Sequence, residues 1–403
     1  MQKVKYHLVI VLFFISLFTS LWLKNIYFIF VFASVSWLVL TKKKIWDNIS
    51  SALFIFGIFY GLCEFYNGYV ESGFVLLSHV VAPVAYYNFG KWIVQKIIES
   101  NKRLWFLTIT LIVFLIQLFL LTFQDIAISG IVNESRRMLI DIGKENNTLS
   151  ATLYGLMSSV GIGAISSAFL KDLKFPIKLV LTCISLLSIL VVIHLVNRTG
   201  IVILAFAIFF SFICSTKMSL SRVMPALFVF IILSIIVYNS GIVGDEMLEA
   251  YASRESERGV ESSTMGGRLD LWQIAIGNLL ISPTGWKSVD YFSHNLWLDI
   301  ARVGGWIPFI IFTVVTISVL RGIRRIIKYD NYKVEPFCVV LSTIVICVLI
   351  NSSVEPVIEA SNMLFFLTIS FFGMVKSVEK EIQNKYHRSF KGFINTISTL
   401  NSK

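Results

Sequence analysis

The chain of 403 residues is 56% hydrophobic and only 15% charged, whereas a typical soluble domain carries about 25% charged residues. This composition excludes an ordinary soluble domain and predicts an integral membrane protein. The net charge of +11 could favour a nucleic-acid ligand, but the placement of the basic residues indicates membrane topology as its cause.

Apolar runs of membrane-spanning length recur along the whole chain. A helix needs about 20 mainly apolar residues to cross the hydrocarbon, and somewhat fewer where its flanks reach the interface. Strands of a membrane barrel alternate over about 10 residues, which these runs do not. We therefore predict an all-α integral membrane protein with twelve transmembrane helices, at 8–23, 26–41, 50–66, 74–90, 104–123, 149–170, 176–196, 199–215, 222–239, 296–320, 336–352 and 360–376.

The basic residues indicate how these helices are oriented. If both termini are cytoplasmic, 25 of the 35 lysines and arginines fall in cytoplasmic segments. The positive-inside rule predicts this bias for an even number of spans. We accordingly expect membrane lipids as partners, with a contribution from anionic headgroups, and we expect no nucleic acid.

The spans divide the chain into four parts. Residues 1–239 hold the first nine helices, 240–293 form a large external loop, 294–376 hold the last three helices, and 377–403 form a basic cytoplasmic tail. Within the loop, apolar residues recur at helical spacing between a glycine pair and Pro283. This pattern predicts an amphipathic helix from Arg268 to Ile281, on the bilayer surface or on the bundle.

Cysteines and acidic residues give no sign of a cofactor. The five cysteines all fall inside apolar spans, where a disulfide framework is not expected. No His, Asp, Glu or Cys cluster has the spacing of metal ligands. We therefore expect no metal ion and no other cofactor.

Arginines concentrate at the predicted external rim, where the positive-inside rule expects few. They come from separate segments: Arg136 and Arg137, Arg198, Arg268 and Arg302. Taken singly, Arg198 and Arg302 could be anchors that reach lipid phosphates, and Asp299 could simply pair with Arg302 at i, i+3. Taken together, they favour an anionic ligand, because the planar guanidinium binds two phosphate oxygens at once.

One histidine joins this set at the head of the tenth span. The side chain of His294 could accept a proton from a hydroxyl nucleophile, so that the set predicts chemistry on a lipid diphosphate. The candidate catalytic residues are His294, Arg268 and Arg198. The candidate substrate-binding residues are Arg136, Arg137, Asn295, Arg302, Trp272 and Asp299.

Four short motifs follow one another in a distinctive order: "NRTG" (197–200), "GGRLDLW" (266–272), "PTG" (283–285) and "HNLWLDIARVGGW" (294–306). Their order, spacing and sidedness resemble the O-antigen ligase/polymerase superfamily of bacterial envelope glycosyltransferases. The resemblance implies a GT-C-like fold and metal-independent glycosyl transfer from an undecaprenyl-diphosphate-linked glycan, at the external face of the bacterial cytoplasmic membrane. It also implies that Arg198 and Arg268 contact the pyrophosphate and that His294 activates the acceptor hydroxyl.

The motifs leave more than one function open. The ligase branch follows its His-Asn with a glycine, two residues and a second glycine, whereas here Gly305 is followed by Trp306, Ile307 and Pro308. This departure favours a polymerase of lipid-linked repeat units, making O-antigen or another surface polysaccharide, with a chain-length regulator as a candidate partner. A ligase that transfers the glycan to the lipid A core is the alternative. A lipid-linked oligosaccharide flippase is less favoured, because transporters usually show internal repeats and polar groups at the midplane.

Overall fold

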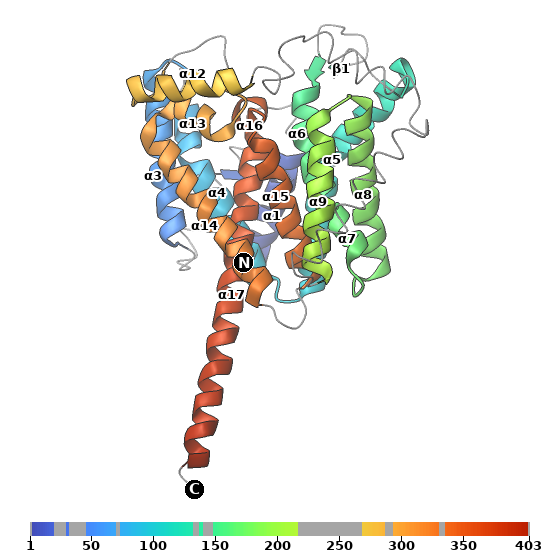
Figure 1. Ribbon diagram of the computed structural model, residues 1–403, viewed down its shortest axis with the longest axis vertical. Coiled ribbons are helices and arrows are strands. Elements are labelled where there is room, and N and C mark those ends of the chain that lie inside the picture. The colour runs from blue at the N-terminus through green and yellow to red at the C-terminus, as the bar shows by residue number, and fades with distance from the viewer. Residues whose placement is uncertain are drawn as a thin grey trace.

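The computed structural model describes residues 2–19, 30–31, 46–69, 73–131, 137–139, 148–216, 268–286, 293–329 and 335–401. In these ranges the chain forms a bundle of helices with one short β-hairpin (Figure 1). Six of the described helices are long and apolar enough to cross a membrane: Asn48–Tyr66, Ser100–Ser129, Thr152–Phe169, Phe175–His194, Trp306–Lys328 and Asn362–Lys385. This architecture fits an all-α, multi-pass membrane protein.

The remaining six predicted spans divide into three groups. One, 74–90, lies within a 24-residue helix, Gly73–Lys96, that is not among the six helices above. Three are shorter apolar helices, at His7–Phe18, Arg198–Cys214 and Pro336–Ser352. The predicted spans 222–239 and 26–41 lie outside the described residues, except for residues 30 and 31. The count of twelve therefore stays a prediction.

The N-terminal half begins with α1 (Gln2–Phe18), α3 (Asn48–Tyr66), α4 (Gly73–Lys96) and α5 (Ser100–Ser129). Helix α3 starts where it does because Asp47 caps it: its Oδ1 accepts a hydrogen bond from Ser50 N at 2.9 Å, and Ser50 Oγ accepts one from Asp47 N at 3.3 Å. This reciprocal arrangement satisfies two backbone donors that a helix start otherwise leaves unpaired.

The middle of the chain follows with strands β1 (Arg137–Leu139) and β2 (Thr148–Ser150), which pair antiparallel with Met138 opposite Leu149. Next come α6 (Ala151–Ile162), the 3₁₀ turn η1 (Gly163–Ile165), α7 (Ser166–Phe169), α8 (Phe175–His194) and α9 (Arg198–Thr216). Pro176 lies in the first turn of α8, where its missing N–H costs no helical hydrogen bond.

The C-terminal part contains α12 (Arg268–Ile281), α13 (Leu296–Gly304), α14 (Trp306–Tyr329), α15 (Pro336–Ser352), α16 (Val357–Ala360) and α17 (Asn362–Asn401). Helix α12 covers the same residues as the predicted amphipathic helix. The prediction of one continuous span over 296–320 is wrong, because Gly305 has a left-handed φ of 72° and divides the segment into α13 and α14. The apolar run therefore supplies a short helix at the end of the bundle and a longer helix of spanning length.

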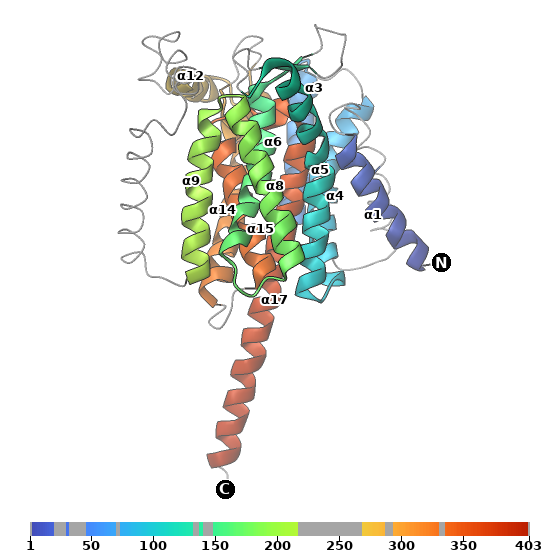
Figure 2. The same cartoon turned by 90° about the vertical axis from the view of Figure 1, so that its right-hand side faces the viewer.

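Helices α4 and α17 pack closely at the centre of the bundle. A Cβ added to Gly90 would lie 1.9 Å from the carbonyl oxygen of Ser370, and one added to Gly373 would lie 2.0 Å from that of Tyr87. No side chain fits at either position, so the two glycines let the helix backbones approach. Figure 2 shows α17 continuing from this central position and projecting well beyond the other helices.

One end of the bundle carries the segments singled out from the sequence. Helix α12 lies across this end, with α13 and α16 beside it (Figure 1), and we refer to it as the α12 end. At the opposite end, ion pairs fix the part of α17 that leaves the bundle, including Arg325 with Glu379 at 2.6 Å and Arg103 with Glu381 at 2.8 Å.

Candidate functional site

The turn that carries His294 has a strained backbone held by one carboxylate. The φ of His294 is 52°, a left-handed conformation that few residues other than glycine adopt. Asp299 is buried and accepts hydrogen bonds from Ser293 N at 2.8 Å, from Ser293 Oγ at 2.6 Å and from Asn295 N at 3.3 Å. These bonds offset the strain, and such strain is found most often at functional sites.

Burial raises the pKa of Asp299 above its usual value, while the hydrogen bonds from Ser293 and the charge of Arg302 lower it only in part. The carboxylate is buried and fixes the backbone on both sides of His294 through its hydrogen bonds to Ser293 and Asn295. In this structure Asp299 supports the turn, whereas the sequence placed it among the substrate-binding candidates.

Asn295 connects the same turn to two helices. Its Oδ1 caps α13 by accepting hydrogen bonds from Trp297 N at 3.1 Å and Leu298 N at 3.2 Å. Its Nδ2 donates to the carbonyl oxygen of Ser353, just after α15, at 3.0 Å. This contact brings the His294 turn against the segment between α15 and α16.

Glu355 lies in that segment and was not among the predicted site residues. Pro356 follows it, and a residue before proline disfavours helical backbone, so the chain leaves α15 and presents Glu355 before α16 begins. Its side chain is 5% exposed. Glu355 Oε1 accepts a hydrogen bond from Arg268 Nη2 at 2.6 Å, and Glu355 Oε2 lies 3.5 Å from His294 Nδ1.

One carboxylate therefore joins the two residues that the sequence favoured most. Arg268 begins α12, His294 precedes α13 and Glu355 follows α15, so three separate segments meet here. The side chains of Arg268 and His294 are 22% and 33% exposed. A ligand can therefore reach the guanidinium and the imidazole, while the carboxylate lies behind them.

Three side chains at or near this position have polar atoms available for a further partner. Among the described residues, His294 Nδ1 and Glu355 Oε2 are buried and form no hydrogen bond, since their 3.5 Å separation lacks the geometry of one. The indole Nε1 of Trp272, one turn along α12 from Arg268, is likewise buried and has no acceptor in the described part of the chain. Buried donors without acceptors are uncommon.

The turn at Pro283–Gly285 fixes the far end of α12 against α13. A Cβ on Gly305 would lie 2.0 Å from the carbonyl oxygen of Pro283, and Trp306 N donates to that oxygen at 2.9 Å. Trp286 N donates to the carbonyl oxygen of Arg302 at 2.8 Å. The Gly304–Gly305 pair is thus a close-packing point.

The described contacts of Arg302 are at this packing interface. Its Nη1 donates to the hydroxyl of Tyr69 at 2.8 Å, and its guanidinium lies 5.3 Å from the centre of the Tyr69 ring. Tyr69 in turn donates to the carbonyl oxygen of Trp286 at 3.1 Å. The side chain of Arg302 is buried and holds α13 to the α3–α4 connection.

Arg198 begins α9 at the α12 end of the bundle, and a short chain of contacts connects its position with Glu355. The Oδ1 of Asn197 caps α9 by accepting from Gly200 N at 3.1 Å, and Asn197 packs directly on Gly155 of α6. The carbonyl oxygen of Gly155 accepts a hydrogen bond from Asn351 Nδ2 at 3.1 Å. The start of α9 is thus beside the last turn of α15, which leads to Glu355.

A second buried polar pair, also missed from the sequence, supports the hairpin before Arg198. His194 is fully buried, with Nε2 2.7 Å from Asp125 Oδ2 and Nδ1 2.9 Å from the carbonyl oxygen of Ile131. These two contacts fix the end of α8 to α5 and to the segment that follows it.

The remaining arginine predictions are only partly covered. Arg137 begins β1, where it pairs in register with Ser150, and Arg136 lies outside the described residues. Within the described residues, no group of three or more His, Cys, Asp or Glu side chains is arranged to hold a metal ion.

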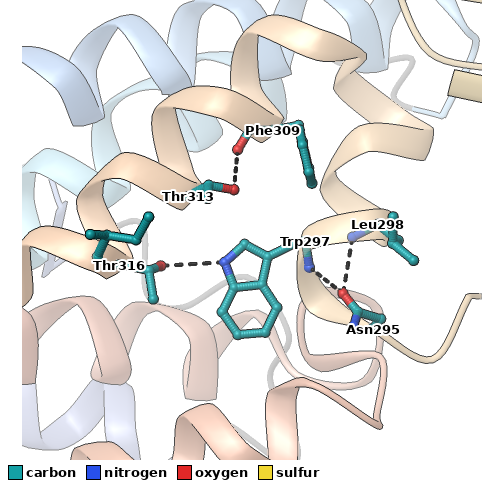
Figure 3. Close-up of a pocket in the computed structure, with 7 residues that line it drawn as sticks. Asn295, Trp297, Leu298, Phe309, Thr313 and Thr316 are labelled. Atoms are coloured by element: carbon teal, nitrogen blue, oxygen red, sulfur yellow. Dashed lines mark hydrogen bonds between the residues drawn. The ribbon is translucent and has the colours of Figure 1, made fainter. Parts of the chain in front are cut away.

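An apolar groove of about 400 Å³ lies between α13 and α14, next to the His294 turn (Figure 3). Asn295, Trp297 and Leu298 line one side, and Phe309, Thr313, Thr316 and Ile317 line the other. The two threonine hydroxyls donate to carbonyl oxygens of their own helix, at 2.7 Å for Thr313 and 2.9 Å for Thr316. With these hydroxyls satisfied, the groove wall is largely apolar.

The groove opens on the outer surface of the bundle. Ile317 in its wall is exposed, and so are Ile310 and Val314, two apolar residues of α14 that do not line the groove. In a membrane protein such a surface faces lipid, so a hydrocarbon chain could enter the groove from the bilayer. Asn295 forms the end of the groove nearest to His294.

The chain matches no known family model and no curated protein.

Proposed function

We propose that this protein is a membrane glycosyltransferase that polymerises polyprenyl-diphosphate-linked oligosaccharide repeat units into a surface polysaccharide. The observation that carries this proposal is the meeting of Arg268, His294 and Glu355 next to an apolar groove that opens toward lipid. The reaction requires a cation to bind the diphosphate of the donor, a base to accept the proton of the acceptor hydroxyl, and a groove to hold the lipid chain.

The donor would be bound by its diphosphate and its lipid chain. Arg268 binds the diphosphate through its planar guanidinium, and Arg198 contributes from the start of α9. The Trp272 indole supplies a further donor to a phosphate oxygen from the same face of α12. The polyprenyl chain occupies the groove between α13 and α14, which places the anomeric carbon near His294.

Glycosyl transfer then follows from this arrangement. The acceptor is the sugar of a second lipid-linked repeat unit, and His294 accepts the proton of its hydroxyl. The hydroxyl oxygen bonds to the anomeric carbon while the bond from that carbon to the phosphate oxygen breaks, and its electron pair remains on the diphosphate. Arg268 and Arg198 stabilise the negative charge that develops there, which is electrostatic catalysis.

Reconstitution in proteoliposomes with polyprenyl-diphosphate-linked repeat units tests this proposal. We expect the wild-type protein to convert single units into a ladder of longer glycans. Arg268→Ala and His294→Ala should lower the rate by about 10²-fold or more, as loss of a stabilising donor or a general base does in other enzymes. Arg324→Ala, an exposed arginine of α14, and His7→Ala, an exposed histidine of α1, are matched controls that should keep the full rate.

The same assay separates the alternatives. Transfer of the glycan to a lipid A core acceptor without lengthening would indicate a ligase. Movement of intact repeat units across the bilayer without any new glycosidic bond would indicate a flippase. A normally inserted Arg268→Ala or His294→Ala protein with wild-type elongation would show that the site is assigned incorrectly.

A further inference from the structure

We propose that Glu355 is a positioning residue whose carboxylate exchanges its partner Arg268 for His294 when a diphosphate binds. The general base, His294, would then gain its orienting hydrogen bond only when the ligand is bound. This inference rests on the proposed function, because it concerns how the same site is switched on. It starts from the unequal distances of one carboxylate to two neighbours, 2.6 Å to Arg268 and 3.5 Å to His294.

The first step concerns the state without ligand. Glu355 is almost completely buried, and a buried carboxylate is stable only with a charged partner or several hydrogen bonds. Arg268 supplies that partner through Oε1. The second oxygen, Oε2, forms no hydrogen bond with any described residue, although His294 Nδ1 is its near neighbour. Glu355 Oε2 and His294 Nδ1 are therefore neighbours that do not form a hydrogen bond in this structure.

The second step concerns what a diphosphate would change. Arg268 is the more accessible partner of the ion pair, with 22% of its side chain exposed against 5% for Glu355. A diphosphate can offer Arg268 two parallel hydrogen bonds and more negative charge than the single contact with Glu355. Binding would thus draw the guanidinium toward the ligand and leave the Glu355 carboxylate without its main counter-charge.

The third step is the transfer of the carboxylate to His294. As the imidazole accepts the proton of the acceptor hydroxyl it becomes a cation, and Glu355 is the nearest described carboxylate to its Nδ1. A hydrogen bond from Nδ1 to Oε2 would orient the ring, so that the other nitrogen, Nε2, accepts the proton. The anion is then paired with the new cation, and Arg268 is paired with the leaving diphosphate.

The backbone supports a small movement of this kind. The His294 turn is held by Asp299 and by the contact of Asn295 with Ser353. Ser353 lies two residues before Glu355 in the same segment. The imidazole and the carboxylate are therefore carried by segments already joined to each other. Closing the distance from 3.5 Å to hydrogen-bond length needs a side-chain adjustment, and no helix has to move.

This arrangement would protect the donor from water. With no diphosphate bound, Glu355 is engaged with Arg268 and His294 lacks its orienting partner, so that the base is incomplete. Coupling the base to the presence of the correct ligand is the logic of induced fit. It predicts that removing the charge of Glu355 has opposite effects on binding and on turnover, which a merely structural residue would not have.

Glu355→Gln is the variant that tests the inference. It keeps the size of the side chain and removes its charge, so Arg268 is held less firmly. We expect undecaprenyl diphosphate to bind the reconstituted Glu355→Gln protein about three- to fivefold more tightly than the wild type. This fold-change corresponds to the contribution of a partly exposed ion pair. The rate of elongation at saturating donor should fall by about 10²-fold, because His294 lacks its orienting carboxylate.

Two comparisons make this result specific. Glu64→Gln changes a second buried carboxylate that contacts a histidine, His79, on neighbouring helices α3 and α4, and it should alter neither affinity nor rate. Glu355→Asp keeps the charge and should recover part of the rate. In the double variant Glu355→Gln/Arg268→Ala the gain in affinity should disappear, since it acts through Arg268.

The outcomes separate this inference from the proposed function. If the wild-type protein elongates no glycan, the proposed function fails, and the titration with undecaprenyl diphosphate alone decides whether Glu355 restrains Arg268. If the wild type elongates and Glu355→Gln matches it in rate, or binds the diphosphate with unchanged or weaker affinity, the inference is overturned. A thermal unfolding midpoint equal to that of the wild type shows that the variant is folded.

Discussion

Ser293 and Asp299 form a closed backbone turn in which one carboxylate oxygen accepts from both the amide and the hydroxyl of the same serine, at 2.8 and 2.6 Å. His294 lies between these two residues with its left-handed backbone. Asp299→Ala would leave the buried amide of Ser293 and the partly buried amide of Asn295 without this acceptor, which costs about 1–3 kcal/mol of unfolding free energy. We expect turnover to fall while the affinity for the donor changes little, because Arg268 is held by Glu355 and not by this turn.

Ser293→Ala is the graded control for that prediction. It removes the hydroxyl bond and leaves the amide bond, so the loss of stability should be smaller, about 0.5–1.5 kcal/mol. Thermal unfolding in detergent and steady-state elongation rates measure both variants. An Asp299→Ala protein with the wild-type rate would show that His294 does not depend on the turn.

The bend at Gly305 gives a second prediction, on stability. Gly305→Ala must place a side chain at a φ of 72°, which costs about 1–2 kcal/mol, and its Cβ would lie 2.0 Å from the carbonyl oxygen of Pro283. We expect a clear loss of stability and of elongation, because the Pro283–Gly285 turn must move away from α13. Gly277→Ala in α12 is the matched control, since no atom lies within 4 Å of the new Cβ.

Gly305→Ala should therefore lower the stability of the protein, whereas Gly277→Ala should not. Within the helix interior, alanine is favoured over glycine by about 1 kcal/mol, so Gly277→Ala should raise the unfolding midpoint or leave it unchanged. Equal midpoints for Gly305→Ala and the wild type would contradict the close approach described for this bend.

Asp47, at the start of α3, gives a prediction about pH. Burial raises the pKa of this carboxyl, but hydrogen bonds from Lys91 and Ser50 and the charge of Lys91 outweigh burial and leave the pKa below its usual value of 3.8. The folded protein thus binds fewer protons at Asp47 than the unfolded chain does. The stabilisation is present above pH 3.8 and is lost as the pH falls through the lower, folded pKa.

Asp47→Asn should therefore lower stability near neutral pH and have a diminishing effect in acid. Asparagine caps a helix as well as aspartate does, so the change isolates the charge. Because the Asp47 side chain is 38% exposed and burial also lowers the pKa of Lys91, the loss should stay within about 1 kcal/mol. Unfolding midpoints across pH 3 to 7 measure it, and a loss that grows toward low pH would contradict the assignment.

The sequence was sufficient to predict features that depend on whether a residue prefers an apolar or an aqueous environment. Apolar runs located the helices of spanning length, and helical spacing between a glycine pair and Pro283 placed α12 at the residues it occupies. The concentration of arginines and one histidine at the predicted rim brought forward Arg268 and His294, which the fold brings to one carboxylate. These features depend on local composition, which a single sequence contains.

The sequence was insufficient where the role of a residue depends on the orientation of its side chain and on contacts with distant parts of the chain. The run over 296–320 is apolar throughout, so its division at Gly305 depends on how closely the Pro283 carbonyl approaches. Asp299 and Arg302 lie at the α12 end of the bundle, and both side chains are buried in packing contacts. Glu355 went unnoticed because an acidic residue in a short connection is common, and its value comes from Arg268, 87 positions away in the chain.

The groove between α13 and α14 gives the last prediction, which separates lipid recognition from diphosphate recognition. Thr313→Trp would fill part of the 400 Å³ space that we assign to the polyprenyl chain. We expect the KM for a long-chain donor to rise about tenfold or more, since each buried methylene contributes about 0.8 kcal/mol, while a donor with a short lipid is used as before. Val314→Trp adds the same side chain at the next, exposed position, outside the groove, and should leave both KM values unchanged. If the two variants respond alike, or if Thr313→Trp lowers the use of long and short donors equally, the polyprenyl chain does not lie in this groove.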